Sequence, residues 1–282
     1  ASEIARVLRF PSAIKIDVFG RGRVELLKFR LPENSPLAGC AVKEIVTKLH
    51  CDVLVCTVER GDEVHIANGE FVFEEKDVIS IVAARKAGEF FRKIKYKMNS
   101  VKDVMVVGGG EIGHYLCEQL IRSGMSVKLI EKDPARCETL CATLDDGVAV
   151  INGDASDQNI LVESGLEQTG AFVALTNLDE ENILLSLFAK SVCDCKCVTK
   201  INRIGFDNVI SKLDLDTIIN PKSITSDTIV RYVRAMSSSR GSNMETLYNV
   251  IKGKVEAAEF IIKEDSPVVD VPLMELDLKP DV

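Results

Sequence analysis

The chain has 282 residues, of which 46% are hydrophobic, so it is long enough for about two domains with packed cores. Its formal net charge of −8 argues against a nucleic-acid groove, because such sites need clustered Lys and Arg side chains to replace phosphate counterions. No apolar run approaches the ~18 residues of a membrane span, and the first residues lack a signal-peptide core. The nine cysteines are an odd number scattered through apparent core segments, which indicates free thiols in a reducing compartment. We therefore expect a globular cytoplasmic chain without an obligatory disulfide.

Residues 13–97 are predicted to form a small α+β domain. Apolar runs rich in β-branched residues favour strands there, and one amphipathic stretch near residues 42–50 favours a helix. The strand candidates span residues 13–19, 24–31, 52–60, 63–67 and 77–84.

Residues 98–238 show a different pattern, in which short strand-like runs alternate with amphipathic helical stretches. Strands are predicted over residues 103–107, 126–131, 148–151, 171–175, 197–201 and 216–219. Helices are predicted between them over residues 111–123, 134–143, 157–164, 180–191 and 206–213. Such alternation is typical of a parallel sheet covered on both faces. The fold class is therefore α/β, with a Rossmann-like, doubly wound sheet of six strands, followed by a long helix that begins near residue 221 and leads into a Ser-rich linker.

An internal repeat gives the organisation of the whole chain. The stretch "GRVELLKFRLPENSPLAGCAVKEI" at 22–45 aligns without gaps on "GKVEAAEFIIKEDSPVVDVPLMEL" at 253–276, and a weaker match relates "IARVLRF" at 4–10 to "IVRYVRA" at 229–235. Residues 239–282 are therefore expected to be a partial second copy of the small domain. Residues 1–12 are expected to be the end of a preceding crossover helix, as if the chain were cut from a tandem array.

The stretch "VVGGGEIGHYLCEQL" carries Gly108, Gly110 and Gly113 in G-x-G-x-x-G spacing, between a predicted strand and a predicted helix. The first glycine permits the tight turn, the second lets backbone approach a pyrophosphate, and the third lets the helix pack closely. Glu131 ends the next strand, near the ~20-residue spacing at which a carboxylate binds ribose hydroxyls. This pattern predicts a dinucleotide site that favours NAD over NADP, although ATP or ADP satisfies the same contacts.

Two further strand ends are expected to complete the crevice. Asp154 follows the third strand, where its carboxylate can accept from an adenine amino group or cap the helix near residue 157. Thr176 and Asn177 follow the fourth strand, which lies beside the first at the topological switch point. They are expected to face the ligand, with helix capping by Asn177 or Asp179 as the alternative.

Four cations lie close to these strand ends in the sequence. Lys132 and Arg136 can soften the discrimination against a 2′-phosphate, but exposed helix charges are the favoured interpretation. Lys200 and Arg203 follow the fifth strand, where a phosphate or interdomain role is possible and a surface charge is favoured.

Several other patterns are set aside. Cys193, Cys195 and Cys197 have C-x-C-x-C spacing, but zinc sites usually pair C-x2-C knuckles, so core or strand-entry cysteines are favoured. Tyr248 and Lys252 imitate the Tyr-x-x-x-Lys pair of short-chain dehydrogenases, yet Gly253 and the β-run after it break the helix that this pair requires.

No catalytic constellation emerges from the chain. The three histidines, which are expected to be structural or surface residues, are His50, His65 and His114. No Ser-His-Asp, Cys-His or paired-carboxylate arrangement is visible. The chain is therefore predicted not to be an enzyme. Two alternatives remain open: an NAD-dependent dehydrogenase, for which Lys200 is the one strand-end proton donor, and a non-regulatory scaffold with a degenerate site.

The motifs "VVGGGEIG", "LIEKD", "GDAS" and "LTNLDEEN", followed by a crossover helix and a small domain of the form "VELLKFRLPENSPLAG", resemble the RCK (KTN) regulators of potassium transport. The resemblance covers nearly the whole chain. It implies an RCK-C domain at 13–97, an RCK-N domain at 98–238 and a partial second RCK-C domain at 239–282.

The resemblance also implies a function and a site. The implied role is a cytoplasmic regulator, peripheral to the membrane, that binds NAD(H), or alternatively ATP or ADP, and gates a Trk-type membrane potassium transporter. The implied assembly is a homo-oligomer, either a dimer or a higher oligomer. The implied cofactor-binding residues are Gly108, Gly110, Glu111, Ile112, Gly113, Glu131, Lys132, Asp154, Ala155, Thr176 and Asn177. No metal and no nucleic acid is implied.

Overall fold

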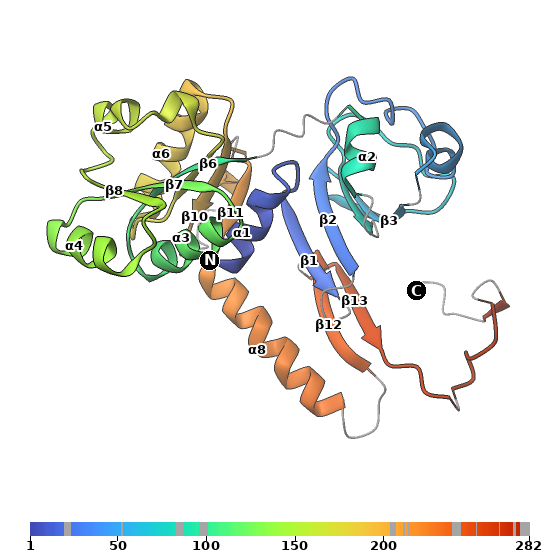
Figure 1. The fold of residues 1–282 in the computed structure, drawn as a ribbon. Coiled ribbons are helices and arrows are strands. Elements are labelled where there is room, and N and C mark those ends of the chain that lie inside the picture. Colours follow the sequence, from blue (N-terminus) through green and yellow to red (C-terminus); the bar gives the residue numbers. More distant parts are fainter. Residues whose placement is uncertain are drawn as a thin grey trace. The chain divides into compact units, whose positions relative to one another are not determined.

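A computed structural model describes residues 1–19, 24–51, 53–82, 87–95, 101–203, 207–210, 212–213, 215–238, 244–251, 253–264, 266–272 and 275–276. The chain divides into two compact units, residues 1–221 and 222–282, and each is described by itself. Figure 1 labels the elements of both.

The first unit begins with helix α1 (Ser2–Arg9) and an antiparallel sheet. The sheet has five strands in the order β1-β2-β5-β3-β4, namely β1 (Lys15–Phe19), β2 (Val24–Arg30), β3 (Leu54–Arg60), β4 (Glu63–Ile66) and β5 (Val78–Val82). All five predicted strands are confirmed, and the predicted helix near residues 42–50 is a π-helical turn, η2 (Ile45–Leu49).

One helix of this part of the chain was not predicted. Helix α2 (Ala87–Lys93) places Phe90 and Phe91 in the core, where both rings meet Phe29 edge-on. The two aromatic residues are adjacent in sequence, so they give no helical periodicity, and their burial depends on the distant ring of Phe29. This helix exists because of tertiary packing.

The second sheet contains six parallel strands in the order β11-β10-β9-β6-β7-β8. They are β6 (Asp103–Val107), β7 (Ser126–Glu131), β8 (Val148–Asn152), β9 (Ala171–Ala174), β10 (Lys196–Lys200) and β11 (Thr217–Ile219). The chain winds outward from β6 to β8 and then returns to β9 on the other side of β6. The predicted doubly wound sheet is confirmed, and its topological switch point lies between β6 and β9.

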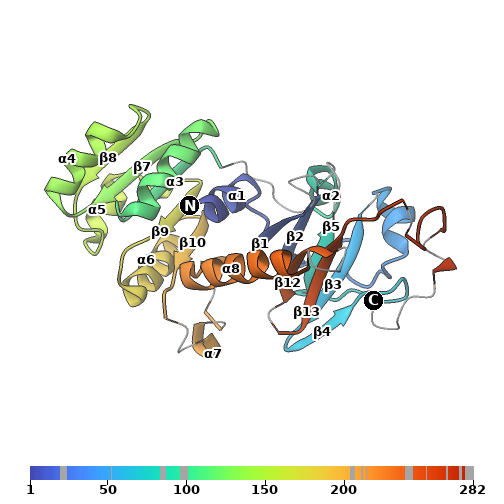
Figure 2. The ribbon, with the colours of Figure 1, turned by 90° about the horizontal axis from the view of Figure 1, so that it is seen from below.

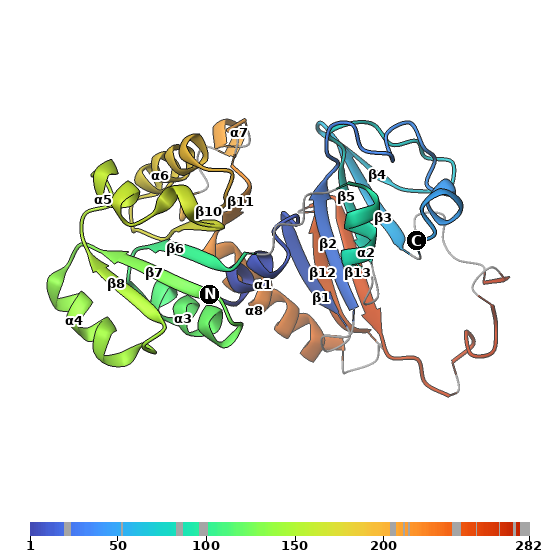
Figure 3. The ribbon, with the colours of Figure 1, turned by 45° about the horizontal axis from the view of Figure 1, so that its top comes forward.

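Helices cover both faces of this sheet, as Figure 3 shows. Helices α3 (Glu111–Arg122) and α4 (Pro134–Thr143) share one apolar core with α1, whose Ile4 and Leu8 are fully buried in it. Helices α5 (Gln158–Glu163) and α6 (Asp179–Val192) share the core on the opposite face with the 3-10 turn η3 (Leu166–Gln168). A short helix α7 (Asp207–Ile210) precedes β11, and the predicted helix at 206–213 also contains residues outside the described part.

The second unit contains helix α8 (Pro221–Ser238) and a hairpin of β12 (Met244–Ile251) and β13 (Val255–Phe260), visible in Figure 2. In the backbone register of the hairpin β1–β2, Ile16 is paired with Leu27; at the repeat-equivalent positions, Leu247 is paired with Ala258. The next two pairs correspond in the same way. The structure therefore confirms that the second hairpin repeats the first in register.

Tyr248 lies on strand β12, so it cannot belong to a helical Tyr-x-x-x-Lys pair, and Lys252 falls outside the described residues. All nine cysteines are free thiols in the structure. Among the residues described, no helix has both the length and the apolar character needed to cross a membrane.

Candidate functional site

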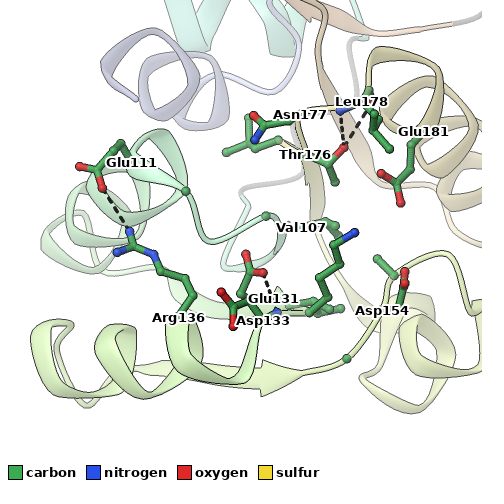
Figure 4. A pocket seen from close by; sticks show the side chains of 17 residues that line it. Val107, Glu111, Glu131, Asp133, Arg136, Asp154, Thr176, Asn177, Leu178 and Glu181 are labelled. Carbon is green, nitrogen blue, oxygen red and sulfur yellow. Dashed lines mark hydrogen bonds and ion pairs between the residues drawn. The ribbon is translucent and has the colours of Figure 1, made fainter.

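A cavity of about 600 Å³ opens at the carboxyl ends of the parallel strands, at the switch point. This volume is in the usual range of small-molecule sites. Its wall comes from the segments that follow β6, β7, β8 and β9 (Figure 4). The lining residues are Val107, Gly108, Gly110, Glu111, Ile130, Glu131, Lys132, Asp133, Arg136, Gly153, Asp154, Ala155, Leu175, Thr176, Asn177, Leu178 and Glu181.

The three glycines of the motif have three different environments. Gly108 has φ +102°, and a Cβ there would lie 2.9 Å from the carbonyl oxygen of Leu175, so only glycine fits without a shift. At Gly113 a Cβ would collide with the carbonyl oxygen of Gly108, which explains how closely α3 packs on the turn. At Gly110, the N-cap of α3, a Cβ would meet nothing within 4 Å. The space beside Gly110 therefore remains open next to the N–H groups of the first helical turn, where anions bind favourably.

Glu131 is held against the glycine turn by two backbone N–H groups. Its Oε2 accepts from Gly109 at 2.7 Å and its Oε1 accepts from Asp133 at 2.9 Å. A carboxylate oxygen can accept more than one hydrogen bond, so both oxygens can still accept from ligand hydroxyls. Glu131 thus has a double role: it fixes the turn and offers an acceptor to the cavity.

Arg136 lies across the same turn from helix α4. Its Nε donates to the carbonyl oxygen of Gly109 at 2.7 Å, and its guanidinium lies 3.4 Å from the exposed carboxylate of Glu111 (Figure 4). The sequence favoured a plain helix surface charge here. The structure instead places Arg136 on the cavity wall, because one turn of α4 returns its side chain to the glycine loop.

Asp154 lies on the wall after β8 and does not cap the following helix. Its Oδ1 accepts from the backbone N–H of Ser156 at 2.9 Å and from the Ser156 hydroxyl at 2.7 Å. These bonds, with a smaller effect of Lys132, lower the pKa of Asp154. The N-cap of α5 is Asp157, whose side chain accepts from Asn159. Asp154 is therefore an ionised acceptor at the cavity.

Thr176 is tied into a buried network around Asn182 of helix α6. Asn182 is fully buried; its Oδ1 accepts from the backbone N–H and the hydroxyl of Thr176, and its Nδ2 donates to the carbonyl oxygens of Thr176 and Lys200. The Thr176 hydroxyl also accepts from the N–H of Leu178 at 3.2 Å. Asn182 therefore joins the ends of β9 and β10 and shapes the wall from behind. A role for this residue at the cavity was not predictable from the sequence, since a polar side chain in a helix is ordinarily exposed.

The structure differs from two interpretations made from the sequence, namely helix capping by Asn177 or Asp179 and a surface charge at Lys200. The N-cap of α6 is Leu178, without a side-chain cap, so neither Asn177 nor Asp179 is the N-cap. The Asp179 carboxylate instead accepts hydrogen bonds from backbone N–H groups that follow β10, and its Oδ2 lies 2.8 Å from the backbone nitrogen of Arg203. Lys200 is only 6% exposed and is not a surface charge, because helix α6 covers the end of its strand. Arg203 is exposed, as the sequence favoured.

The charge of the wall is predominantly negative. Five carboxylates line the cavity, on Glu111, Glu131, Asp133, Asp154 and Glu181, against the two cations Lys132 and Arg136. In Figure 4, Glu111 and Arg136 lie at one end, and Asp154 and Glu181 lie toward the other. A cavity with this excess of carboxylates favours ligands that present hydroxyl and amino donors and carry little negative charge.

Nine of the eleven residues predicted for the site line this cavity. Of the other two, Gly113 packs on the turn and Ile112 packs against the core under α3. The wall residues that sequence reasoning did not single out include Asp133, Leu178 and Glu181. Glu181 had a usable signal, since the first turn of a helix that follows a switch-point strand faces the crevice. The cysteines near β10 form part of the core, and no metal-binding group of His, Cys, Asp or Glu is found among the described residues.

Two protein-family models match segments of the first unit, one in each of its two sheets. A model described as the TrkA-C domain matches residues 26–95, and a model described as the TrkA-N domain matches residues 104–221. The chain therefore contains a TrkA-C domain followed by a TrkA-N domain.

Curated relatives agree with this assignment. The chain is 30% identical to the Trk system potassium uptake protein TrkA homolog of Archaeoglobus fulgidus, over 84% of this chain and 53% of the relative. It is 29% identical to the Trk system potassium uptake protein TrkA of Vibrio alginolyticus and 30% identical to that of Halomonas elongata, over 99% and 98% of this chain and 60% of each relative. The chain thus spans little more than half the length of these TrkA relatives.

Solved structures share the fold. The crystal structure of the GsuK RCK domain has a TM-score of 0.57 at 15% identity, covering 87% of this chain and 53% of that one. The GsuK channel bound to NAD has a TM-score of 0.56 at 16% identity, covering 87% of this chain and 44% of that one. At these identities the likeness concerns the fold of the TrkA-C and TrkA-N domains.

Proposed function

We propose that this chain is a nucleotide-sensing regulator of potassium uptake. In this proposal an adenine nucleotide binds in the cavity of the TrkA-N domain, and its binding changes the activity of a Trk-type membrane potassium transporter. The observation that carries the proposal is the open space beside Gly110, at the N-terminus of α3, next to the Glu131 carboxylate. The names of the curated relatives supply the link to potassium uptake.

NAD(H) is the ligand that we place first, with ADP or ATP as the alternative. The wall has five carboxylates and two cations, and the terminal phosphates of ADP and ATP carry more negative charge than the pyrophosphate of NAD(H). The ribose hydroxyls of any of these nucleotides suit the acceptor oxygens of Glu131. The GsuK channel, which shares the fold, has been solved bound to NAD.

The proposed role is regulatory and does not require bond breaking. A ligand that binds one conformation about 100-fold more tightly than another supplies about 2.7 kcal/mol of bias, enough to shift a two-state equilibrium. We propose that the chain acts in the cytoplasm as a homo-oligomer, peripheral to the membrane through its transporter partner.

Nucleotide titration tests the ligand half of this proposal. Calorimetry of the chain with NADH, NAD, ADP and ATP should give measurable binding, tightest for the dinucleotides. The variant Glu131→Ala should weaken each by about 1 to 3 kcal/mol, because the ribose loses an ionised acceptor and the Gly109 N–H loses its partner. Glu138→Ala, at an exposed position on α4, is the matched control and should bind as the wild type does.

Potassium flux tests the regulatory half. In vesicles that contain the Trk-type transporter, the regulator and a potassium gradient, NADH should change the rate of potassium uptake, and Glu131→Ala should shift that response to higher NADH concentration. Oxidation of NADH by added keto acids, or reduction of NAD by added hydroxy acids, without any effect on flux, would favour the dehydrogenase alternative instead.

A further inference from the structure

Lys200 is a buried cation directly behind the cavity wall and is not itself one of the lining residues. It ends strand β10 and is 6% exposed. Its ammonium donates to the carbonyl oxygen of Leu175 at 3.3 Å and to Oδ1 of Asn177 at 3.4 Å. Leu175 and Asn177 both line the cavity, so Lys200 contacts the wall from the side that faces the protein interior.

The bond to Asn177 fixes the orientation of its side-chain amide. An ammonium group can only donate, so the oxygen of the amide must face Lys200. The NH2 group of Asn177 is then the end of the amide available to the cavity. Lys200 therefore makes Asn177 a hydrogen-bond donor toward a ligand, although asparagine alone has no such preference.

The charge of Lys200 is also incompletely compensated. Both of its acceptors are neutral oxygens, at distances near the long end of the hydrogen-bond range. Burial lowers the pKa of Lys200, and the Asp179 carboxylate on α6 opposes that effect. A buried cation with neutral acceptors gains when an anion arrives nearby, because the anion offsets the cost of burying the charge.

The position of Lys200 brings this charge to the phosphate end of the site. Its acceptor, the Leu175 carbonyl, abuts the glycine turn, since a Cβ on Gly108 would lie 2.9 Å from that oxygen. The ammonium is therefore separated from the turn by a single peptide group.

We propose that Lys200 is a positioning residue of the nucleotide site, which orients Asn177 as a donor and places a cation behind the subsite for the ligand's phosphates. This role rests on the proposed function of the cavity. It assigns recognition of the phosphates to a buried residue outside the cavity wall, in addition to the backbone of the glycine turn.

The test compares ADP with adenosine, which share the base and the ribose but differ in the phosphates. Replacing Lys200 by methionine keeps an unbranched buried side chain and removes the charge. Lys200→Met should weaken ADP binding about tenfold in calorimetry and leave adenosine binding unchanged. Arg203→Met, at an exposed neighbouring position, is the control and should leave both affinities unchanged.

Two further measurements separate positioning from a general structural effect. In a double-mutant cycle, Asn177→Ala should weaken ADP binding less in the Lys200→Met background than in the wild type, because the amide is no longer oriented there. Because burial lowers the pKa of Lys200, raising the pH should reduce the advantage of the wild type over Lys200→Met as the lysine loses its proton.

Three results would overturn the role of Lys200: wild-type ADP affinity in Lys200→Met, an equal loss for ADP and adenosine, or additive effects in the cycle. If the folded wild-type chain binds neither ADP nor adenosine, that result would overturn the proposed function itself and the role of Lys200 with it.

Discussion

Gly110 and Gly113 belong to one motif, yet the structure gives them opposite responses to the same substitution. A Cβ on Gly113 collides with the Gly108 carbonyl oxygen, so Gly113→Ala should lower the free energy of unfolding by about 1 to 3 kcal/mol. A Cβ on Gly110 meets no protein atom within 4 Å, so Gly110→Ala should leave stability within about 0.5 kcal/mol. Because that Cβ occupies the open space at the helix N-terminus, it should weaken nucleotide binding at least about tenfold.

Urea unfolding and NADH titration of the two variants check this pair. A Gly110→Ala variant that binds NADH like the wild type would show that phosphates do not approach this glycine. A Gly113→Ala variant with wild-type stability would show that the turn and α3 can separate at no cost.

The position of a residue on the cavity wall could be predicted from the sequence where backbone conformation or a strand end determines it. The glycines, Glu131 and Asp154 all follow from strand, turn and helix spacing. The network of Asn182, and the burial of Lys200, could not be predicted in this way. Both depend on helix α6 closing over the end of β10, which is a tertiary event without a local sequence signal.

Strand β10 also contains a titratable residue, Lys196, that is hydrogen-bonded to a segment near the start of the chain. Its first residue, Lys196, donates to the carbonyl oxygen of Ala13, which lies between α1 and β1, at 3.0 Å. Burial lowers the pKa of Lys196 from its ordinary 10.5 to about 8, while the Asp216 carboxylate opposes the shift. Between these two values the unfolded chain binds a proton that the folded chain has released. The contribution of Lys196 to stability should therefore rise with pH across this window and be constant below about pH 8.

The free energy of unfolding in urea, measured from pH 7.5 to about 10.5, checks this link. Lys196→Met should lose the rise, whereas Lys102→Met, at an exposed position, should keep it. The same pH profile in wild type and Lys196→Met would mean that Lys196 keeps its proton in the folded chain.

At the scale of elements, the alternation of strands and helices in residues 101–219 was predictable almost to the residue. The parallel strands there are short apolar runs, and helices α3, α4 and α5 begin after a glycine or a side chain that caps the helix. Helix α2 was missed because two adjacent phenylalanines have no periodicity. The π-helical turn at 45–49 was predicted as an ordinary helix, since hydrophobic spacing alone does not distinguish the two.

At the scale of the whole molecule, the internal repeat predicts which elements are equivalent but not how deeply their equivalent residues are buried. The repeat predicted that helices α1 and α8 are equivalent and that each is followed by the same hairpin, and the hairpin registers agree. It did not predict their surroundings: Ile4 and Leu8 are fully buried, whereas the matching Ile229 and Val233 are 57% and 53% exposed. Burial depends on what packs against a helix, and the sequence of the helix does not contain that information.

The proposed regulatory function depends on a dinucleotide lying in the cavity at the switch point. A crystal structure of the chain grown with saturating NADH tests this claim most directly. It should show the adenosine ribose hydroxyls hydrogen-bonded to Glu131 and the pyrophosphate beside Gly110 at the N-terminus of α3. An empty cavity in the presence of saturating NADH, or NADH bound at another place on the chain, would contradict it.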